Sequence, residues 1–237
     1  MFRPLCIIPA RGGSKGLPGK HLLDLGGKPV IHWTALAASE SEYLDAIVVS
    51  SDSEDILRRT MYDNIVSHHR TSQMATDESP VEVTLRSVLE YIELHAECIY
   101  DPVVWLQADC PIRLPGLIDW MLDMYKHTRN ITFDSVVTVK SPIDPPEWLQ
   151  ERTDSGVLSP LFPSLDVPFR RQDTKEYFQL DGSIMVISRE QLLKKNTPKL
   201  HGFLGRMIPQ IQVFPYTISI DTEWDYKIAK LAKLEGY

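Results

Sequence analysis

The sequence predicts an α/β fold, with a doubly wound and mostly parallel sheet in a single domain over residues 1–237. Two observations support this prediction. Short, continuously apolar runs such as residues 46–50 and 103–107 are typical of strands that helices cover on both faces. Segments with helical spacing, among them residues 30–39, alternate with such runs near the amino terminus. A β-loop-α-β-α-β order of this kind predicts parallel strands with a ligand at their carboxyl ends.

The boundaries of the elements follow from apolar runs, turn signals and helix caps. Residues 5–8 form the first predicted strand, which stops at Pro9 because proline cannot donate to a central ladder. Ser79, Pro80 and Glu82 combine an N-cap, a proline at the first helical position and a capping-box acid, so they predict a helix start. The other predicted strands are 46–50, 65–67, 103–107, 135–139 and 181–187, and the other predicted helices are 30–39, 54–61, 115–125 and a last one ending near 234.

Composition is that of an ordinary globular protein. Of the 237 residues, 43% are hydrophobic and 24% are charged, which is enough for a buried core. The net charge of −7 argues against nucleic acid as a partner, although one basic loop can still bind a nucleotide. No apolar run reaches membrane-spanning length and no signal peptide is recognisable, so we expect no membrane association. Three cysteines without metal-ligand spacing predict reduced thiols and a cytoplasmic location.

A glycine-rich basic loop follows the first strand. Residues 9–16 read PARGGSKG, and residues 17–20 add a second glycine-containing turn that ends in Lys20. Glycines let the backbone approach a ligand closely, and successive N–H groups can form a concave anion site. Arg11, Lys15 and Lys20 supply positive charge that suits a polyphosphate. The glycine spacing matches neither the dinucleotide fingerprint nor the Walker pattern. The loop is therefore predicted to bind phosphates, and a basic surface loop is the alternative.

At these residues the sequence resembles the cytidylyltransferases that make CMP-activated acid sugars, most of all the CMP-N-acetylneuraminate synthetase branch. His21 stands where that branch usually has asparagine. The resemblance implies a fold like that of nucleotide-diphospho-sugar transferases, with CTP and an acid sugar of the sialic type as substrates. It also implies that Arg11, Lys15 and Lys20 are catalytic. The nucleotide-binding residues that it implies in and after the loop are Ala10, Arg11, Gly12, Gly13, Ser14, Lys15 and His21.

Other positions extend the resemblance along the chain. Arg70 and Ser79 match residues that hold the cytosine in the family, although Arg70 can equally be read as part of a surface ion pair. Gln107 and the acid Asp181, which replaces an amide of the family, are expected to contact the acid sugar. Arg171 and Gln172 could donate to the sugar carboxylate or serve as polar interface residues.

Two aspartates are the predicted ligands of Mg²⁺. Asp109 follows the strand at 103–107, where ketodeoxyoctulosonate-activating relatives place a magnesium-binding aspartate, and Asp221 precedes the last helix. The sialate-activating relatives have a second aspartate where this chain has Ser219, so one ligand is lost there and one is gained at Asp109. The alternative for Asp109 is the N-cap of the next helix, and Asp225 is expected to be a helix-face or cap residue.

The segment 141–173 differs in character from the rest of the chain. It contains six prolines and little helical periodicity. The resemblance implies an excursion that crosses to a second subunit and forms a homodimer. From the residues alone, a long structured loop or lid is equally possible.

Departures from the sialate pattern leave other functions open. They occur at His21, Val81, Asp109, Asp181 and Ser219, which cluster at expected contact positions. One alternative is CMP transfer to a different acceptor, such as a ketodeoxyoctulosonate-type sugar or a phosphonate. The other alternative is a nucleotide-binding homologue with weak catalytic activity.

Overall fold

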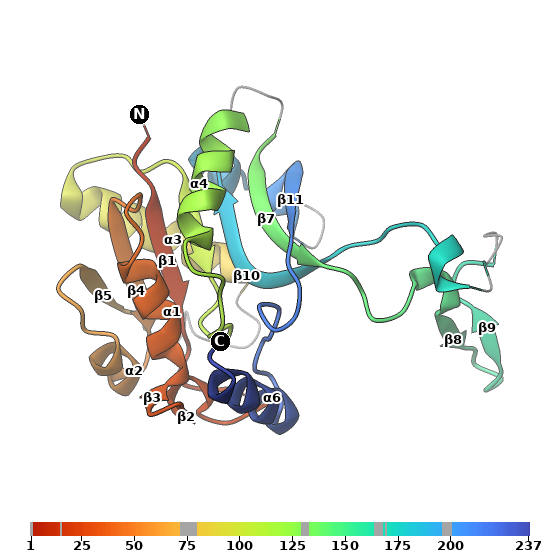
Figure 1. Cartoon of the computed structure of the whole chain (residues 1–237). Helices are drawn as coiled ribbons and strands as arrows, with labels where there is room; N and C mark the ends of the chain where they lie inside the picture. Colours follow the sequence, from red (N-terminus) through yellow and green to blue (C-terminus); the bar gives the residue numbers. More distant parts are fainter. Residues whose placement is uncertain are drawn as a thin grey trace.

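A computed structural model of the chain describes residues 2–14, 16–71, 80–128, 133–163, 168, 170–195 and 201–237. Within these residues the main feature is a seven-stranded sheet with the order β11-β7-β10-β6-β1-β4-β5 (Figure 1). The strands of this sheet are β1 (Leu5–Pro9), β4 (Ala46–Ser51), β5 (Ile65–His69), β6 (Val103–Leu106), β7 (Ser135–Lys140), β10 (Gln179–Ile187) and β11 (Met207–Ile211).

Strand direction confirms the predicted mostly parallel sheet. β1 pairs in parallel with β4 and β6, β4 with β5, and β7 with β11. β10 runs antiparallel between β6 and β7. The parallel strands β1, β4, β5 and β6 all end at one edge of the sheet, and a parallel α/β sheet binds its ligands at such an edge.

Helices cover both faces of the sheet and create two apolar cores. Alternate residues of β1 point to opposite sides, so Cys6 and Ile8 belong to one core while Leu5 and Ile7 belong to the other. The helices α1 (Val30–Ser39), α2 (Glu54–Arg59) and α4 (Leu117–Thr128) pack on the first side. The helices α3 (Val81–Ala96) and α5 (Arg189–Leu193) pack on the second side.

A third, smaller core lies beneath the carboxyl edge of the sheet. Ala229 and Ala232 of the last helix, α6 (Glu223–Leu234), pack there with Leu25 and Ile220. Leu25 belongs to a small hairpin of β2 (Asp24–Leu25) and β3 (Lys28–Pro29). A short 3-10 helix, η1 (Lys20–Leu22), leads from the glycine loop into this hairpin. This core therefore brings the loop near the amino terminus and the last helix to the same part of the molecule.

Several boundaries differ from the predictions. α3 starts at Val81, and Pro80 occupies the N-cap position rather than the first helical one, because its backbone is extended (ψ 139°). The predicted cap Ser79 lies outside the described residues. α4 starts at Leu117, two residues later than predicted, and continues to Thr128. The elements of the body that were not predicted are β2, β3, η1, α5, β11 and η5 (Gly202–Leu204), and no helix or strand was predicted within 141–173.

The described residues of 141–178, which are 141–163, 168 and 170–178, form an arm that projects from the body (Figure 1). It carries η3 (Pro146–Trp148), a hairpin of β8 (Gln150–Arg152) and β9 (Leu158–Pro160), and η4 (Arg171–Asp173). The outgoing and returning chains are joined by a hydrogen bond from the Tyr177 hydroxyl to Glu147 Oε1 (2.7 Å). The described residues of the arm therefore form regular elements, and the dimerising excursion and the loop or lid both stay predictions. Among the described residues, no helix combines the length and the apolar character needed to cross a membrane.

Candidate active site

Three predicted functional segments and one turn without a predicted role, that of Asp52, meet at the carboxyl edge of the sheet. The glycine loop follows β1, the turn with Asp52 follows β4, Arg70 follows β5 and Asp109 follows β6. Asp221 reaches the same edge because the backbone N–H of Ile220 donates to the Asp109 carbonyl (2.9 Å). The prediction of a ligand site at this edge therefore agrees with the geometry.

The glycine loop is held at its two ends. On one side, the Ala10 N–H donates to the Ser50 carbonyl and the Gly12 N–H donates to Asp52 Oδ1, both at 2.9 Å. On the other side, a Cβ atom at Gly16 would lie 2.5 Å from the Asp221 carbonyl oxygen, so only glycine fits there. A Cβ atom at Gly13 would meet no atom within 4 Å. The middle of the loop is thus the part that a ligand can approach, and Lys15 lies outside the described residues.

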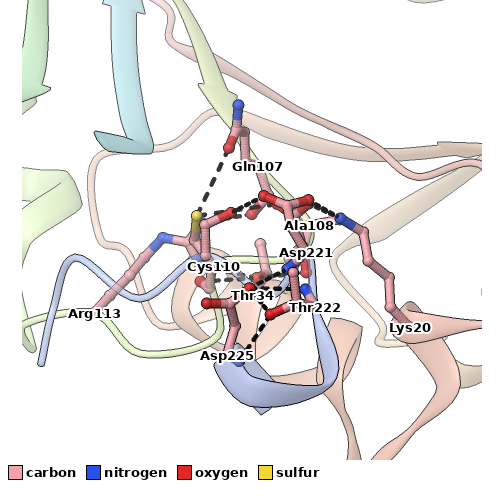
Figure 2. A network of polar contacts seen from close by, with 11 residues as sticks. Lys20, Thr34, Gln107, Ala108, Cys110, Arg113, Asp221, Thr222 and Asp225 are labelled. Atoms are coloured by element: carbon pink, nitrogen blue, oxygen red, sulfur yellow. Dashed lines mark hydrogen bonds and ion pairs between the residues drawn. The ribbon is translucent and has the colours of Figure 1, made fainter. Parts of the chain in front are cut away.

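Asp109 and Asp221 converge on a single positive charge. That charge is the Lys20 ammonium, which lies 2.8 Å from Asp221 Oδ1 and also donates to Asp109 Oδ2. Figure 2 shows the Lys20 side chain reaching toward Asp221 from the opposite side to Arg113. Burial would lower the pKa of Lys20, but the two carboxylates outweigh it and raise this pKa, so the amine stays protonated. The sequence predicted that the two aspartates would meet but did not place Lys20 between them.

Asp225 caps the last helix and does not join this group. Its Oδ2 accepts from the Thr222 N–H (2.7 Å), and its own N–H donates to the Thr222 hydroxyl (3.2 Å), which is a capping box. The prediction of a cap residue is confirmed. The cap also accepts from the Asp221 N–H (3.2 Å) and so fixes the backbone next to the converging carboxylates.

His21 is buried beside these charges. It is 6% exposed, and its Nδ1 has no hydrogen-bond partner among the described residues. Burial lowers the pKa of His21 to about 4, partly opposed by Asp109 and assisted by Lys20 and Arg11. The ring is therefore neutral at physiological pH and carries a buried polar atom that a ligand could satisfy.

Arg70 is also buried, which removes the alternative of a surface ion pair. One guanidinium nitrogen donates to Thr84 Oγ1 (3.3 Å), while Nε has no partner in the described part of the chain. Burial lowers the pKa of Arg70, and the nearby Asp52 opposes this effect. Such a buried guanidinium with an unused donor is consistent with a ligand contact. Ser79, which was predicted to act with it, is outside the described residues.

Asp181 lies in β10 next to Gly182, against which the Gln107 side chain packs. Asp181 is buried, its Oδ1 accepts from the Ser183 N–H (2.8 Å), and its Oδ2 has no described partner. Burial raises the pKa of Asp181, and the hydrogen bonds from Thr138 and Ser183 oppose this. A Cβ atom at Gly182 would lie 2.1 Å from Gln107 Oε1, so glycine leaves room for the Gln107 side chain.

Arg171 and Gln172 are not brought to this edge by their own chain. Both belong to η4 in the arm. The Arg171 guanidinium donates to the Ile143 carbonyl and lies 5.7 Å from the centre of the Trp148 ring. Their predicted contact with the sugar stays a prediction, and in this structure Arg171 stabilises the base of the arm.

An open cleft of about 1010 Å³ adjoins the converging carboxylates. Asp221 and Ser219 line one side, and the base of the arm with Tyr177 lines another. Lys140 is the only Lys or Arg among the described residues of this lining. Lys140 was not predicted because it ends a strand without a recognisable motif. Asp52 was given no role in the site, although an acid directly after a buried strand was the available signal.

Comparison with known proteins identifies the family. The sequence model of the family described as "Cytidylyltransferase" matches residues 5–199. The chain belongs to the cytidylyltransferase family. It is accordingly a nucleotidyltransferase, and the resemblance inferred from the glycine loop is confirmed.

Individual relatives of this cytidylyltransferase include enzymes for acid sugars. The chain is 34% identical over 200 residues to the CMP-N,N'-diacetyllegionaminic acid synthase of Legionella pneumophila, covering 83% of this chain and 82% of that one. It is 30% identical over 227 residues to the N-acylneuraminate cytidylyltransferase of Streptococcus agalactiae, and it spans 52% of that longer protein. A solved CMP:2-keto-3-deoxy-manno-octonic acid synthetase complexed with CTP has the same fold, with a TM-score of 0.65 and 19% identity over 98% of this chain and 99% of that chain.

Proposed function

We propose that this cytidylyltransferase transfers CMP from CTP to an acid sugar of the nonulosonic class and releases pyrophosphate. The observation that supports it most is the convergence of Asp109, Lys20 and Asp221 beside the glycine loop. The names of the relatives in legionaminic and sialic acid activation support the acceptor class.

The residues of the site have different proposed roles in this reaction. The sugar hydroxyl attacks the α-phosphorus of CTP in line, a new O–P bond forms, the bond to the β-phosphate oxygen breaks, and the hydroxyl proton is lost to solvent. Nucleotidyl transfer of this kind depends on positioning and on neutralising charge. The amides around Gly13 together with Arg11 would hold the β- and γ-phosphates and stabilise the leaving pyrophosphate. The Lys20 ammonium, which contacts Asp221, would neutralise charge near the α-phosphate.

Mg²⁺ is the proposed cofactor, and Asp109 and Asp221 are its proposed ligands. The two side chains fit this role because they already converge on one cation, the Lys20 ammonium. The described residues contain no cluster of three or more His, Cys, Asp or Glu that could hold a metal. Mg²⁺ commonly uses one or two protein carboxylates and takes its remaining ligands from phosphates and water. When bound, it would supply charge neutralisation at the phosphates.

The cleft beside Asp221 is the proposed acceptor site. Lys140 would attract the carboxylate of an acid sugar there, and Asp181 and Gln107 remain proposed contacts of the same sugar. Because Arg171 and Gln172 lie in the arm, we propose that they approach the acceptor only from the arm of a second subunit. This proposal includes a homodimer and a cytoplasmic location, where CTP is available.

A substrate panel tests the function. Pyrophosphate release is measured with CTP, Mg²⁺ and each of N-acetylneuraminic, legionaminic, pseudaminic and ketodeoxyoctulosonic acids and a phosphonate, and then with the other nucleoside triphosphates. Release with a nonulosonic acid supports the proposal. Release only with ketodeoxyoctulosonic acid or the phosphonate assigns the other acceptor class. CTP binding without release from any acceptor would favour a nucleotide-binding protein.

Two substitutions test the metal ligands. Asp109→Asn and Asp221→Asn should each abolish most turnover and weaken Mg²⁺-dependent CTP binding, because an amide replaces a charged ligand. Asp225→Asn is the matched control, since an amide oxygen can still cap the helix. Unchanged magnesium dependence in Asp109→Asn would remove Asp109 from the metal site.

A further inference from the structure

Asp52 lies at the carboxyl end of β4 and has no role in the function proposed above. Its Oδ1 accepts the Gly12 N–H at 2.9 Å across a separation of 40 residues. This hydrogen bond joins the loop after β1 to the turn after the neighbouring parallel strand. Ser53 is the N-cap residue of α2, but its side chain makes no cap hydrogen bond, and Asp52 turns toward the loop instead of the helix.

The backbone around Gly12 packs tightly on this turn. A Cβ atom at Gly12 would lie 3.0 Å from Ser53 Cβ and 3.8 Å from Asp52 Oδ2. Because its N–H is used by Asp52, Gly12 is an anchor rather than a phosphate donor. Gly13 next to it faces open space. Gly12 is therefore fixed, while the adjacent Gly13 is accessible to a ligand.

The same turn holds Arg70. The Arg70 N–H donates at 2.8 Å to the carbonyl of Ser51, the residue before Asp52. This hydrogen bond fixes the backbone of Arg70 beside the turn. The Asp52 charge also acts on the Arg70 guanidinium, because it opposes the lowering of the Arg70 pKa by burial. One turn thus contacts both the phosphate loop and the residue expected at the cytosine.

We propose that Asp52 is a positioning residue for the nucleotide, whose carboxylate fixes the glycine loop at Gly12 and aligns it with Arg70. This inference rests on the proposed function, because it assumes that CTP binds at the loop. A carboxylate close to a triphosphate would repel it unless the carboxylate were occupied by other donors. The bond to Gly12 and the neighbouring guanidinium of Arg70 meet this condition.

The test compares Asp52→Ala and Asp52→Asn with wild type. Calorimetry gives the Kd for CTP without acceptor, and steady-state kinetics gives the KM of each substrate. Asp52→Ala should raise the Kd and KM for CTP by about 10- to 100-fold, the range expected from a lost hydrogen bond to a charged group. The KM of the acid sugar should stay within about twofold. Asp52→Asn should recover most of the affinity, since the amide oxygen can accept from Gly12.

Asp55→Ala is the matched control, because Asp55 lies in the first turn of α2 and forms an exposed ion pair with Arg58 (2.6 Å). It should bind CTP like wild type. The proposal is overturned if Asp52→Ala binds CTP within about twofold of wild type. It is also overturned if both KM values and the melting temperature change together in the alanine and asparagine variants. Wild type that fails to bind CTP would overturn the proposed function as well, which separates the two failures.

Discussion

At the scale of the residue, the ammonium of Lys20 neutralises the two carboxylates that converge at the site. It is nearly buried and faces the largely buried Asp109, whereas the Asp221 side chain is 68% exposed. Solvent screens the second pair, so the first contributes more to the interaction. Without the ammonium, two carboxylates would face each other across an unneutralised gap.

Lys20→Met tests this role, because methionine keeps the length of the side chain and removes its charge. We expect turnover to fall by about two orders of magnitude or more, and the melting temperature to fall because Asp109 loses its partner. Initial rates and thermal unfolding are the measurements. Lys227→Met is the control, since Lys227 makes a surface pair with Glu223 (3.0 Å). Normal turnover in Lys20→Met would limit Lys20 to a structural role.

His21 makes folding sensitive to acid. Its pKa is about 4 in the folded chain and 6.5 in the unfolded chain, so the unfolded chain binds the proton first. The free energy of unfolding should be unaffected by this group above pH 6.5 and should decrease as the pH falls toward 4. A pKa lowered from 6.5 to about 4 corresponds to a loss of ~3 kcal/mol at the acid end.

Urea denaturation at pH 7 and at pH 4.5 measures this effect. His21→Asn has no ionisable group at the position, so its free energy of unfolding should decrease less between the two pH values than that of wild type. An equal decrease in both proteins would show that His21 titrates normally in the folded chain.

At the scale of the element, the glycine loop and the segment before α6 are in direct contact. Gly16→Ala would place a Cβ atom 2.5 Å from the backbone oxygen of Asp221, so one of the two segments must move. We expect a loss of about 1–3 kcal/mol of stability, as for other overpacked sites, together with lower turnover. Gly13→Ala should keep the melting temperature of wild type, because its Cβ atom meets open space. Equal melting temperatures for the two variants would contradict the contact.

Elements with strong local signals could be predicted from the sequence, and those without could not. α1 has the predicted bounds because a glycine-proline turn precedes it and its apolar face is regular. β11 was missed because it is an edge strand that alternates exposed and half-buried residues and contains Pro209. α5 is a single short turn of helix, and β8 and β9 are three-residue strands. Such short elements depend on contacts that a local pattern does not contain.

The residues of the candidate site also fall into those with a local sequence signal and those without one. The glycine loop, Asp109 and Asp221 could be predicted because their motifs resemble those of a family. The place of Lys20 between the aspartates depends on packing across 89 and 201 residues of sequence. The contact of Asp52 could not be predicted because its partner, Gly12, lies on a different strand-loop unit.

At the scale of the whole molecule, the arm carries apolar side chains that its own chain leaves in solvent. The exposed apolar residues on and around its hairpin are Leu149, Val157, Leu158, Leu161 and Phe162. Exposed apolar surface of this kind commonly marks an interface between proteins. A second copy of the chain is the occupant that the proposed homodimer requires.

Sedimentation at micromolar concentration should therefore show a dimer. The double variant Val157→Asp, Leu158→Asp should shift the protein toward monomers and lower its turnover, because charges would be buried at the interface. Its melting temperature should change little, since both side chains are more than 60% exposed in the single chain. A wild-type monomer with full activity would rule out the dimer.

The hairpin of β8 and β9 should also be less stable than the body of the molecule. It has three residue pairs, and within the described part of the chain neither of its strands pairs with the seven-stranded sheet. A two-stranded hairpin by itself is only marginally stable in water. Its amide hydrogens should therefore exchange with solvent through local opening, while those of β1 and β6 exchange only when the body unfolds. A partner that packs against the hairpin would slow this local opening. The amide exchange rate of the hairpin therefore reports directly whether a partner is bound.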